Sequence, residues 1–467
     1  PVLKGSGYET FAQTWSSRDK VMIVGANDGM VHCFNVLTGE EIWAFIPFNL
    51  VPKLRNMWPV DEATQERYFA RDVYVDSSPV VEDVYINDEW KTVLICGQGR
   101  GQGSGRTADA TGNFYFALDI TDINNPQVLW EFTDPVMGET WSVPVVGKIT
   151  KDGQDSWAAF MGSGYDNVPG QGIQGNRFYA VDIADGTAFW TFDSEPEVDT
   201  SAVWANGENV AVAFPGSPSS IDVDEDGYTD RVYIADLEGR LWKIDASLEF
   251  ISSSPWVEEM LYEDSRNYPI VTKPEAWRDP ASISAKPRIY FGTGGDDKAP
   301  DAAVYSFIAL IDGDTPEVEW FLGDPDILGL PAEKQTGSFS AGEKVWADPK
   351  IANYIVYFST LTGNIETVDP CSNLAGIGRL YARFIKPIAG SSLGATAFKS
   401  AGGPMENMTL EIKTRAAVTL GESERAGGVR KREVYIQEYD STIQKLEQPA
   451  GAMLKIKSWR EIFKIIK

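Results

Sequence analysis

A repeated pattern of short apolar segments constrains the fold of this chain more than any other feature. Each copy has an apolar run, a turn of Gly, Asp or Asn, a second run ending near Asp, a polar turn and a third run that carries Trp. The runs are rich in Val, Ile, Tyr, Phe and Trp, which is typical of β-strands, and no long segment has the apolar period of a helix. Seven copies can be followed, of which the last is the most degenerate: 21–43, 92–130, 157–190, 231–245, 288–320, 354–369 and 433–459.

Self-similar units of this kind predict an all-β fold, a modified seven-bladed β-propeller with long inter-strand insertions. Seven copies in 467 residues correspond to about 67 residues per blade, compared with roughly 40–50 in compact propellers. The first and last blades of a closed ring must meet. We therefore expect strands near the C-terminus to complete the blade that begins at Val21, and residues 1–467 to form a single propeller domain.

The Trp residues have a structural role in this prediction. In the third copy Asp182, Gly186 and Trp190 are spaced Asp-x-x-x-Gly-x-x-x-Trp, which resembles the sheet-docking signature of quinoprotein-like propellers. A Trp at the end of a strand can lie flat on the next blade and bury its ring between two sheets. We expect these residues to belong to the core rather than to a ligand-binding surface.

Charge and hydropathy exclude several classes of protein. The chain has 41 Lys and Arg against 68 Asp and Glu, a formal net charge of −27. Such an acidic surface repels phosphate backbones, so we expect no nucleic-acid partner. No run approaches the roughly 18 apolar residues of a transmembrane segment. The chain begins at Pro1 with no Met and no signal peptide, and we expect it to be a mature or truncated part of a longer protein.

Few residues are available for thiol, zinc or imidazole chemistry. Cys33, Cys96 and Cys371 fit no zinc spacing, and although one pair could form a disulfide, the sequence leaves the pairing open. The single histidine, His32, alternates with Val31 and Cys33 along a predicted strand, and we expect it to be structural. We predict no catalytic residues and no enzymatic activity.

One acidic segment, residues 221–230, has the spacing of a calcium loop. It reads Ile-Asp-Val-Asp-Glu-Asp-Gly-Tyr-Thr-Asp, and Gly227 stands at position 6, where such a loop turns sharply. The carboxylates fall at positions 1, 3, 5 and 9, namely Asp222, Asp224, Asp226 and Asp230. Position 7, which supplies a backbone carbonyl, is Tyr228. The segment departs from an EF-hand at position 12, where Tyr233 replaces Glu, and strands rather than helices flank it.

Electrostatics favours a bound cation at this segment. Two carboxylates about 6 Å apart repel each other by about 3 kcal/mol at an effective dielectric constant of about 20. Calcium prefers 6–8 oxygen ligands, which a tight loop can wrap around one point, whereas magnesium demands stricter octahedral geometry. The alternative is a solvated acidic turn whose carboxylates are splayed apart. We predict Ca²⁺ as the cofactor.

Several segments together resemble the C-terminal propeller of the PilC/PilY family of type IV pilus biogenesis and tip-adhesion proteins. The most specific is the acidic loop followed by Asp230–Lys243, and the resemblance covers nearly the whole chain. The others are Asp76–Val80, Phe114–Thr121, Trp141–Pro144, Gly162–Asp166, Pro269–Pro274, Ile289–Gly294 and Ser458–Glu461.

The resemblance implies a non-enzymatic, calcium-dependent pilus protein at the bacterial cell surface or pilus tip, reached through the periplasm. Its implied roles are support of pilus extension against retraction, surface adhesion and twitching motility. Implied partners are minor pilins and a host or abiotic surface, and an N-terminal adhesive region is expected to be absent from this chain. The family's metal ligands map onto Asp222, Asp224, Asp226, the Tyr228 carbonyl and Asp230.

Two other functions are compatible with a propeller. A quinoprotein dehydrogenase shares the blade signature, but those enzymes typically use adjacent cysteines, which this chain lacks. A periplasmic scaffold propeller that assists outer-membrane assembly is the second alternative, although such scaffolds lack a calcium loop of this kind. Fold alone does not decide between these functions.

Overall fold

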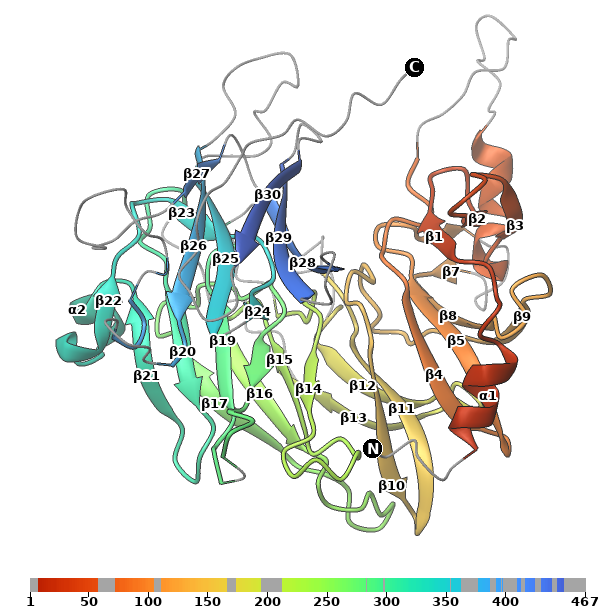
Figure 1. The fold of residues 1–467 in the computed structure, drawn as a ribbon, viewed down its shortest axis with the longest axis horizontal. Helices are drawn as coiled ribbons and strands as arrows, with labels where there is room; N and C mark the ends of the chain where they lie inside the picture. Colours follow the sequence, from red (N-terminus) through yellow and green to blue (C-terminus); the bar gives the residue numbers. More distant parts are fainter. Residues whose placement is uncertain are drawn as a thin grey trace, which may run out of the picture. The chain divides into compact units, whose positions relative to one another are not determined.

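In the structure, a computed structural model, nearly all of the regular secondary structure is β-strand (Figure 1). It describes residues 7–57, 72–104, 111–165, 174–194, 212–282, 284–296, 299–352, 354–362, 377–386, 392–395, 397, 410–412, 416–424, 430–438 and 443–448. Strands account for 46% and helices for 6%, so the predicted all-β class is confirmed. The described helices are α1 (Tyr8–Thr14) and α2 (Pro325–Leu328), with 3-10 turns η1 (Phe48–Leu50), η2 (Lys53–Met57) and η4 (Ala332–Lys334).

The chain divides into two compact units, of which the first is Pro1–Ala202, Asn209–Asp236 and Trp242–Met260. It contains consecutive antiparallel sheets whose strands are ordered along the chain. The first three are β1 (Val21–Gly25), β2 (Val31–Asn35), β3 (Glu41–Phe45); β4 (Val80–Ile86), β5 (Glu89–Gly97), β8 (Tyr115–Asp119), β9 (Gln127–Phe132); and β10 (Val145–Lys151), β11 (Gln154–Gly162), β12 (Arg177–Asp182), β13 (Ala188–Asp193). The fourth is β14 (Ser219–Ile221), β15 (Arg231–Ala235), β16 (Arg240–Asp245), β17 (Glu258–Glu263), and β6 (Gly103–Ser104) pairs with β7 (Thr111–Gly112).

The second unit is Val203–Glu208, Leu237–Leu241 and Leu261–Lys467, and the division between the units falls within β16 and β17. Its first sheet is β18 (Glu275–Trp277), β19 (Arg288–Gly292), β20 (Phe307–Ile311), β21 (Glu317–Leu322) and β22 (Gln335–Gly337). The next is β23 (Glu343–Val345), β25 (Ile355–Thr362), β26 (Ile377–Phe384) and β27 (Leu410–Ile412), with β24 (Lys350–Ala352) also paired to β25. The last is β28 (Ala416–Glu424), β29 (Arg430–Glu438) and β30 (Ile443–Gln448).

The predicted repeat matches three of the four strands in sheets β4–β9 and β10–β13, and two of the four, β15 and β16, in sheet β14–β17. In the third copy, for example, the three predicted runs fall on β11, β12 and β13. The three four-stranded sheets add a further strand at the start of the copy, namely β4, β10 and β14, which the repeat did not include. The second half of the sixth copy, 364–369, lies outside the described residues. The number of blades and the closure of the ring stay predictions.

Tryptophan joins successive sheets of the first unit. The indole N–H groups donate to backbone carbonyls of the next sheet at 2.9 Å, as Trp43 to Ile123, Trp130 to Ile183 and Trp190 to Trp256. Trp130 and Trp190 are each only 6% exposed, which confirms that they belong to the core. The predicted spacing has a steric reason, because a Cβ on Gly186 would lie 2.6 Å from Cγ of Trp130.

A glycine at the end of the second strand forms the other part of each joint. A Cβ on Gly162 would lie 2.3 Å from the carbonyl oxygen of Phe214, immediately before the next sheet. Gly97 has the same relation to the carbonyl oxygen of Thr140 at 2.3 Å, and Gly25 to that of Val75 at 2.6 Å. The repeated glycine therefore identifies β1 as a second strand, equivalent to β5 and β11.

Among the described residues, sheet β1–β2–β3 therefore has no counterpart of the first strand that its neighbours have. The register shift between the third and fourth strands agrees, since it falls at Cys33/Phe34 just as it falls at Ala117/Leu118 in the next sheet. Met22 and Val24 on β1 are 57% and 42% exposed, whereas the equivalent Leu94 and Cys96 on β5 are fully buried. One edge and one face of β1 are thus uncovered among the described residues.

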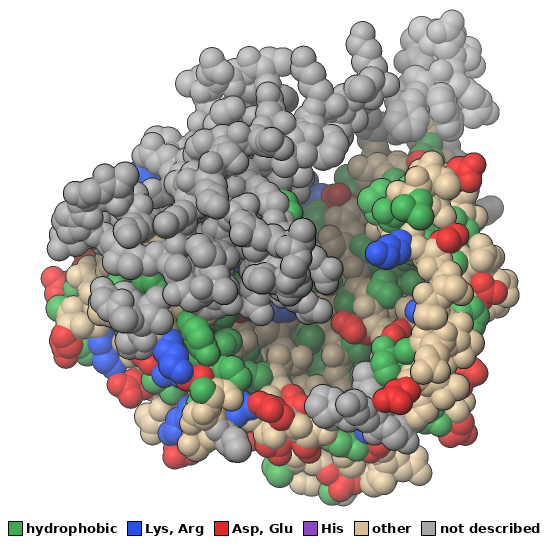
Figure 2. Space-filling view, in the orientation of Figure 1, with side chains coloured by type: hydrophobic (Ala, Val, Ile, Leu, Met, Phe, Trp, Pro, Cys, Tyr) green, Lys and Arg blue, Asp and Glu red, His purple; other side chains and the backbone are tan. Residues whose placement is uncertain are grey.

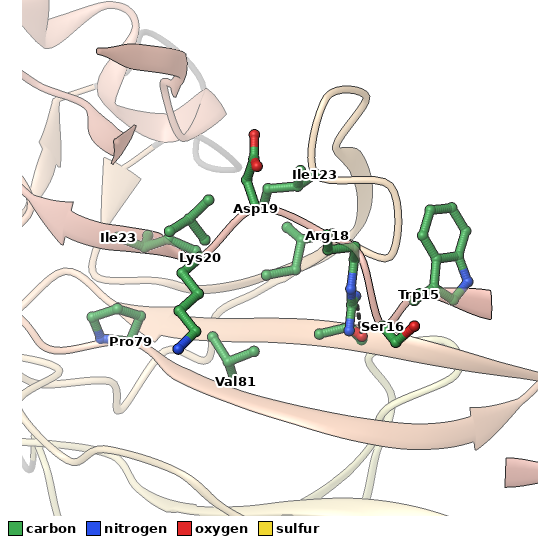
Figure 3. Close-up of a pocket in the computed structure, with 12 residues that line it drawn as sticks. Trp15, Ser16, Arg18, Asp19, Lys20, Ile23, Pro79, Val81 and Ile123 are labelled. Carbon is green, nitrogen blue, oxygen red and sulfur yellow. Dashed lines mark hydrogen bonds between the residues drawn. The ribbon is translucent and has the colours of Figure 1, made fainter. Parts of the chain in front are cut away.

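A cavity of about 610 Å³ lies beside this uncovered edge. Figure 3 shows Lys20 reaching down between Pro79 and Val81, with Ile23 nearby. Arg18 also lines the cavity, and its guanidinium donates to Oγ1 of Thr92 (2.8 Å). The lining includes Val21 and Ile23 of β1 and Val81 of β4.

Candidate metal centre

The acidic segment forms the turn between β14 and β15 in the first unit. Ile221 pairs with Arg231 across the hairpin, and the Asp230 N–H donates to the Ile221 carbonyl (3.0 Å), so the two strands bring the ends of the segment together. The connecting segment, residues 222–230, is short and strongly acidic, so its carboxylates lie in a small volume.

Asp222 organises the turn through backbone hydrogen bonds. Its Oδ1 accepts the N–H of Glu225 (2.6 Å) and its Oδ2 accepts the N–H of Gly227 (2.7 Å). Glu225 and Gly227 both have left-handed φ values, 63° and 90°, and these reverse the chain direction within three residues. Glycine at position 227 meets this backbone demand without a steric cost.

Three of the predicted ligands converge. One carboxylate oxygen from each of Asp222, Asp224 and Asp226 can be chosen so that all three lie within 4.8 Å of one another. Asp222 is half-buried and the other two are exposed. The donor chemistry fits a hard cation, because all three groups offer anionic oxygen.

Asp230 has a different position in the loop from the group of three. It is only 8% exposed, and its Oδ2 accepts the N–H groups of Val223 (2.5 Å) and Asp224 (3.2 Å). Burial raises the pKa of this carboxyl, the two hydrogen bonds lower it, and the charges of Asp224 and Asp222 raise it, with a net increase. Asp230 therefore holds the backbone of the loop, and its role as a metal ligand stays a prediction.

Tyr228 connects the loop to the neighbouring sheet β10–β13. Its O–H donates to Oδ1 of Asp155 (2.7 Å), and the ammonium of Lys148 donates to its Oη (2.9 Å) and lies 4.2 Å from the ring centroid. Lys148 and Asp155 also form an ion pair (2.6 Å). Neither residue was predicted, because each lies more than 70 positions from Tyr228 and meets it only through sheet packing.

The other residues noted in the sequence have structural surroundings. Cys33 and Cys96 are buried free thiols. Burial raises the pKa of the Cys33 thiol to about 11 and raises that of the Cys96 thiol further. Cys371 lies outside the described residues. His32 lies between Asp28 and Glu41.

Among the described residues no helix combines the length and apolar character needed to cross a bilayer. Figure 2 shows carboxylate side chains spread over the visible described surface.

Consecutive antiparallel sheets joined by Trp and Gly, together with an acidic loop on one hairpin, define a protein of the β-propeller class with a candidate cation site. The family model for the PilY1 beta-propeller domain matches residues 1–258. The chain belongs to this family. The solved C-terminal domain of Pseudomonas aeruginosa PilY1 has the same fold, with a TM-score of 0.62 and 22% identity over 92% of this chain and 94% of that one.

Curated relatives agree with the family. The chain is 32% identical over 249 residues to the type IV pilus biogenesis factor PilY1 of P. aeruginosa strain UCBPP-PA14, which is 52% of this chain and 19% of that protein. It is 28% identical over 492 aligned positions to a PilY1 homologue of Xylella fastidiosa strain Temecula1, covering 98% of this chain and 36% of the homologue. The chain thus spans only a minor part of the length of these relatives.

Proposed function

We propose that this chain is the calcium-binding propeller part of a type IV pilus biogenesis protein that acts without catalysis. The observation that carries the proposal is the convergence of the Asp222, Asp224 and Asp226 oxygens within 4.8 Å, in a chain that belongs to the PilY1 family. The relatives named as pilus biogenesis factors support the pilus role. Minor pilins at the tip and a host or abiotic surface are the proposed partners, at the bacterial surface.

The residues of the proposed calcium site have different roles. Asp222, Asp224 and Asp226 offer oxygens, the Tyr228 carbonyl is the proposed fourth protein ligand, and Asp230 holds the loop backbone through its buried carboxylate. Bound calcium would supply the positive charge that offsets the repulsion among the carboxylates. In its absence the same carboxylates favour a looser loop. We propose that this difference controls pilus extension against retraction, and with it adhesion and twitching.

Calorimetric titration of chelator-stripped protein tests the site. We expect the wild-type chain to bind one calcium ion and Asp226→Ala to bind none, because the variant removes a converging ligand. A dissociation constant in the nanomolar range would indicate a permanent ion, whereas a micromolar or weaker one permits regulation. If neither protein binds calcium, the proposed site is wrong.

The pilus role needs a test in the source bacterium. There we expect Asp222→Ala in the full-length protein to impair piliation or its balance with retraction, with the protein present at wild-type level. Normal piliation and normal retraction in that strain would contradict the calcium-dependent part of the proposal.

A further inference from the structure

The β10–β11 hairpin has two separate connections to the acidic loop, both within the first unit. The first is the Tyr228 side chain, which binds Lys148 on β10 and Asp155 on β11. Backbone contacts reinforce it, since the Thr229 N–H donates to the Lys148 carbonyl (2.7 Å). The approach is close enough that a Cβ on Gly147 would lie 2.2 Å from Oγ1 of Thr229.

The second connection runs from the end of the loop to the tip of the same hairpin. The Asp230 carbonyl accepts the N–H of Ala246 (2.7 Å), four residues before Phe250. The backbone of Phe250 then pairs with the hairpin tip, because its N–H donates to the Thr150 carbonyl and its carbonyl accepts the Asp152 N–H, both at 2.8 Å.

We infer that the β10–β11 hairpin is the element that responds to calcium, with Tyr228 as the positioning residue that links it to the loop. This inference rests on the calcium site proposed above. Tyr228 has two roles. Its backbone carbonyl is a proposed calcium ligand, and its side chain forms hydrogen bonds with Lys148 and Asp155. A change in the position of its backbone therefore reaches the hairpin directly, without passing through the core.

The hairpin can respond without unfolding of the sheet. Asp155 is largely exposed, and its ion pair with Lys148 (2.6 Å) is made by Oδ2, whereas Tyr228 donates to Oδ1. Exposed contacts of this kind open at low free-energy cost compared with the buried strands of the same sheet. A loop fixed by a cation holds Tyr228 in place, and a loop without one releases the restraint on the hairpin.

Amide hydrogen exchange of the full chain, with and without calcium, tests the link. In wild-type protein we expect calcium to slow exchange in the hairpin around Lys148–Asp155. Tyr228→Phe keeps the backbone carbonyl and the ring but loses the O–H. We expect it to weaken calcium binding by about two- to tenfold, the range of one hydrogen bond, and to remove most of the calcium-dependent slowing in the hairpin.

Two further variants complete the experiment. Tyr8→Phe loses a comparable hydrogen bond, to Oδ2 of Asp83 at 2.8 Å, far from the loop in sequence, and we expect wild-type calcium affinity and hairpin exchange. Asp222→Asn should give the same hairpin exchange with and without calcium. Unchanged exchange of β4–β9 in Tyr228→Phe establishes that this variant is folded.

The two proposals fail in different ways. If wild-type protein binds calcium and Tyr228→Phe shows the full wild-type response in the hairpin, the inference is wrong and the calcium site stands. If wild-type protein binds calcium with no change in hairpin exchange, the inference is again wrong alone. An absence of calcium binding by wild-type protein overturns both.

Discussion

His32 occupies a small acidic site on β2. Its Nδ1 lies 2.9 Å from Oε2 of Glu41 and its Nε2 lies 3.0 Å from Oδ2 of Asp28. Desolvation lowers the pKa of the imidazole, but hydrogen bonds to Glu41 and Asp28 raise it by more, so the net pKa lies above its ordinary value. The structural role expected for this residue therefore includes a charge that depends on pH.

The sign of this effect follows from linkage. Because the folded-state pKa is raised, the contribution of His32 to stability is fully present below the unfolded pKa of about 6.5 and is lost as pH rises through the folded pKa. We expect the wild-type chain to gain stability relative to His32→Gln at about pH 5.5 and to lose that gain near pH 8.5.

The single imidazole makes the measurement direct. In a protein labelled at histidine, one NMR signal should titrate with a midpoint above about 6.5. Denaturant unfolding of both proteins at the two pH values then gives the stability difference. A midpoint below that of a free histidine, or a stability difference with the opposite pH dependence, would contradict the structure.

Local spacing made the acidic loop predictable at this scale. The positions of Asp222, Asp224 and Asp226 along the chain are enough to bring their oxygens together, because the turn that joins them is short. The role of Asp230 as a backbone acceptor and the contacts of Tyr228 depend on which strands pack nearby. No pattern within the segment carries that information.

At the scale of elements, the contacts that Trp and Gly make between successive sheets explain why these two residues recur in the repeat. Each indole donates to a carbonyl between the third and fourth strands of the next sheet, as Trp130 does to Ile183. In sheets β4–β9 and β10–β13 the second and third strands were predictable because their apolar runs are buried, and the fourth because it carries Trp130 or Trp190. First strands such as β10 have alternating partial burial and no Trp, so their apolar signal is weaker.

Removing one of these hydrogen bonds should cost measurable stability. We expect Trp130→Phe to lower the free energy of unfolding by about 2–3 kcal/mol. The variant leaves the Ile183 carbonyl without the indole donor and replaces a buried indole by a smaller ring. Chemical unfolding monitored by circular dichroism measures the difference.

Trp157, a partly buried residue that packs against the same core cluster, provides a control. It packs on Trp90, with ring centroids 5.9 Å apart, but its indole makes no hydrogen bond to another described residue. We expect Trp157→Phe to cost about 1 kcal/mol. Equal costs for the two variants would show that the hydrogen bond to Ile183 does not contribute.

At the scale of the whole molecule, the first sheet has three strands among the described residues, whereas each of the next three sheets has four. The chain enters this sheet at β1 in the place of a second strand, beside a cavity of about 610 Å³. The prediction that C-terminal strands complete the blade beginning at Val21 gives a source for the first strand. The sequence could suggest such closure from the repeat alone, but the strand that closes the sheet depends on long-range pairing, which periodicity does not encode.

Deletion of residues 449–467 tests this closure. We expect the amides of β1 to lose at least about tenfold protection from exchange, because a strand edge without a partner opens more easily. The amides of β10–β13, whose sheet is complete, should be unaffected. Unchanged protection of β1 would mean that the missing strand comes from elsewhere.

The contacts that Gly162 and Trp190 make between sheets also bear on how the number of sheets changes in evolution. The hydrogen bond and the closest backbone approach of each joint involve a glycine Cα, an indole and backbone carbonyls, so these two contacts do not depend on which side chain the accepting residue carries. A tandem duplication of one sheet would carry its own glycine, its own tryptophan and its own accepting carbonyls into the new position. Recombination that changes the number of sheets can therefore keep this hydrogen bond and this close approach, while the buried side chains around them must still fit one another.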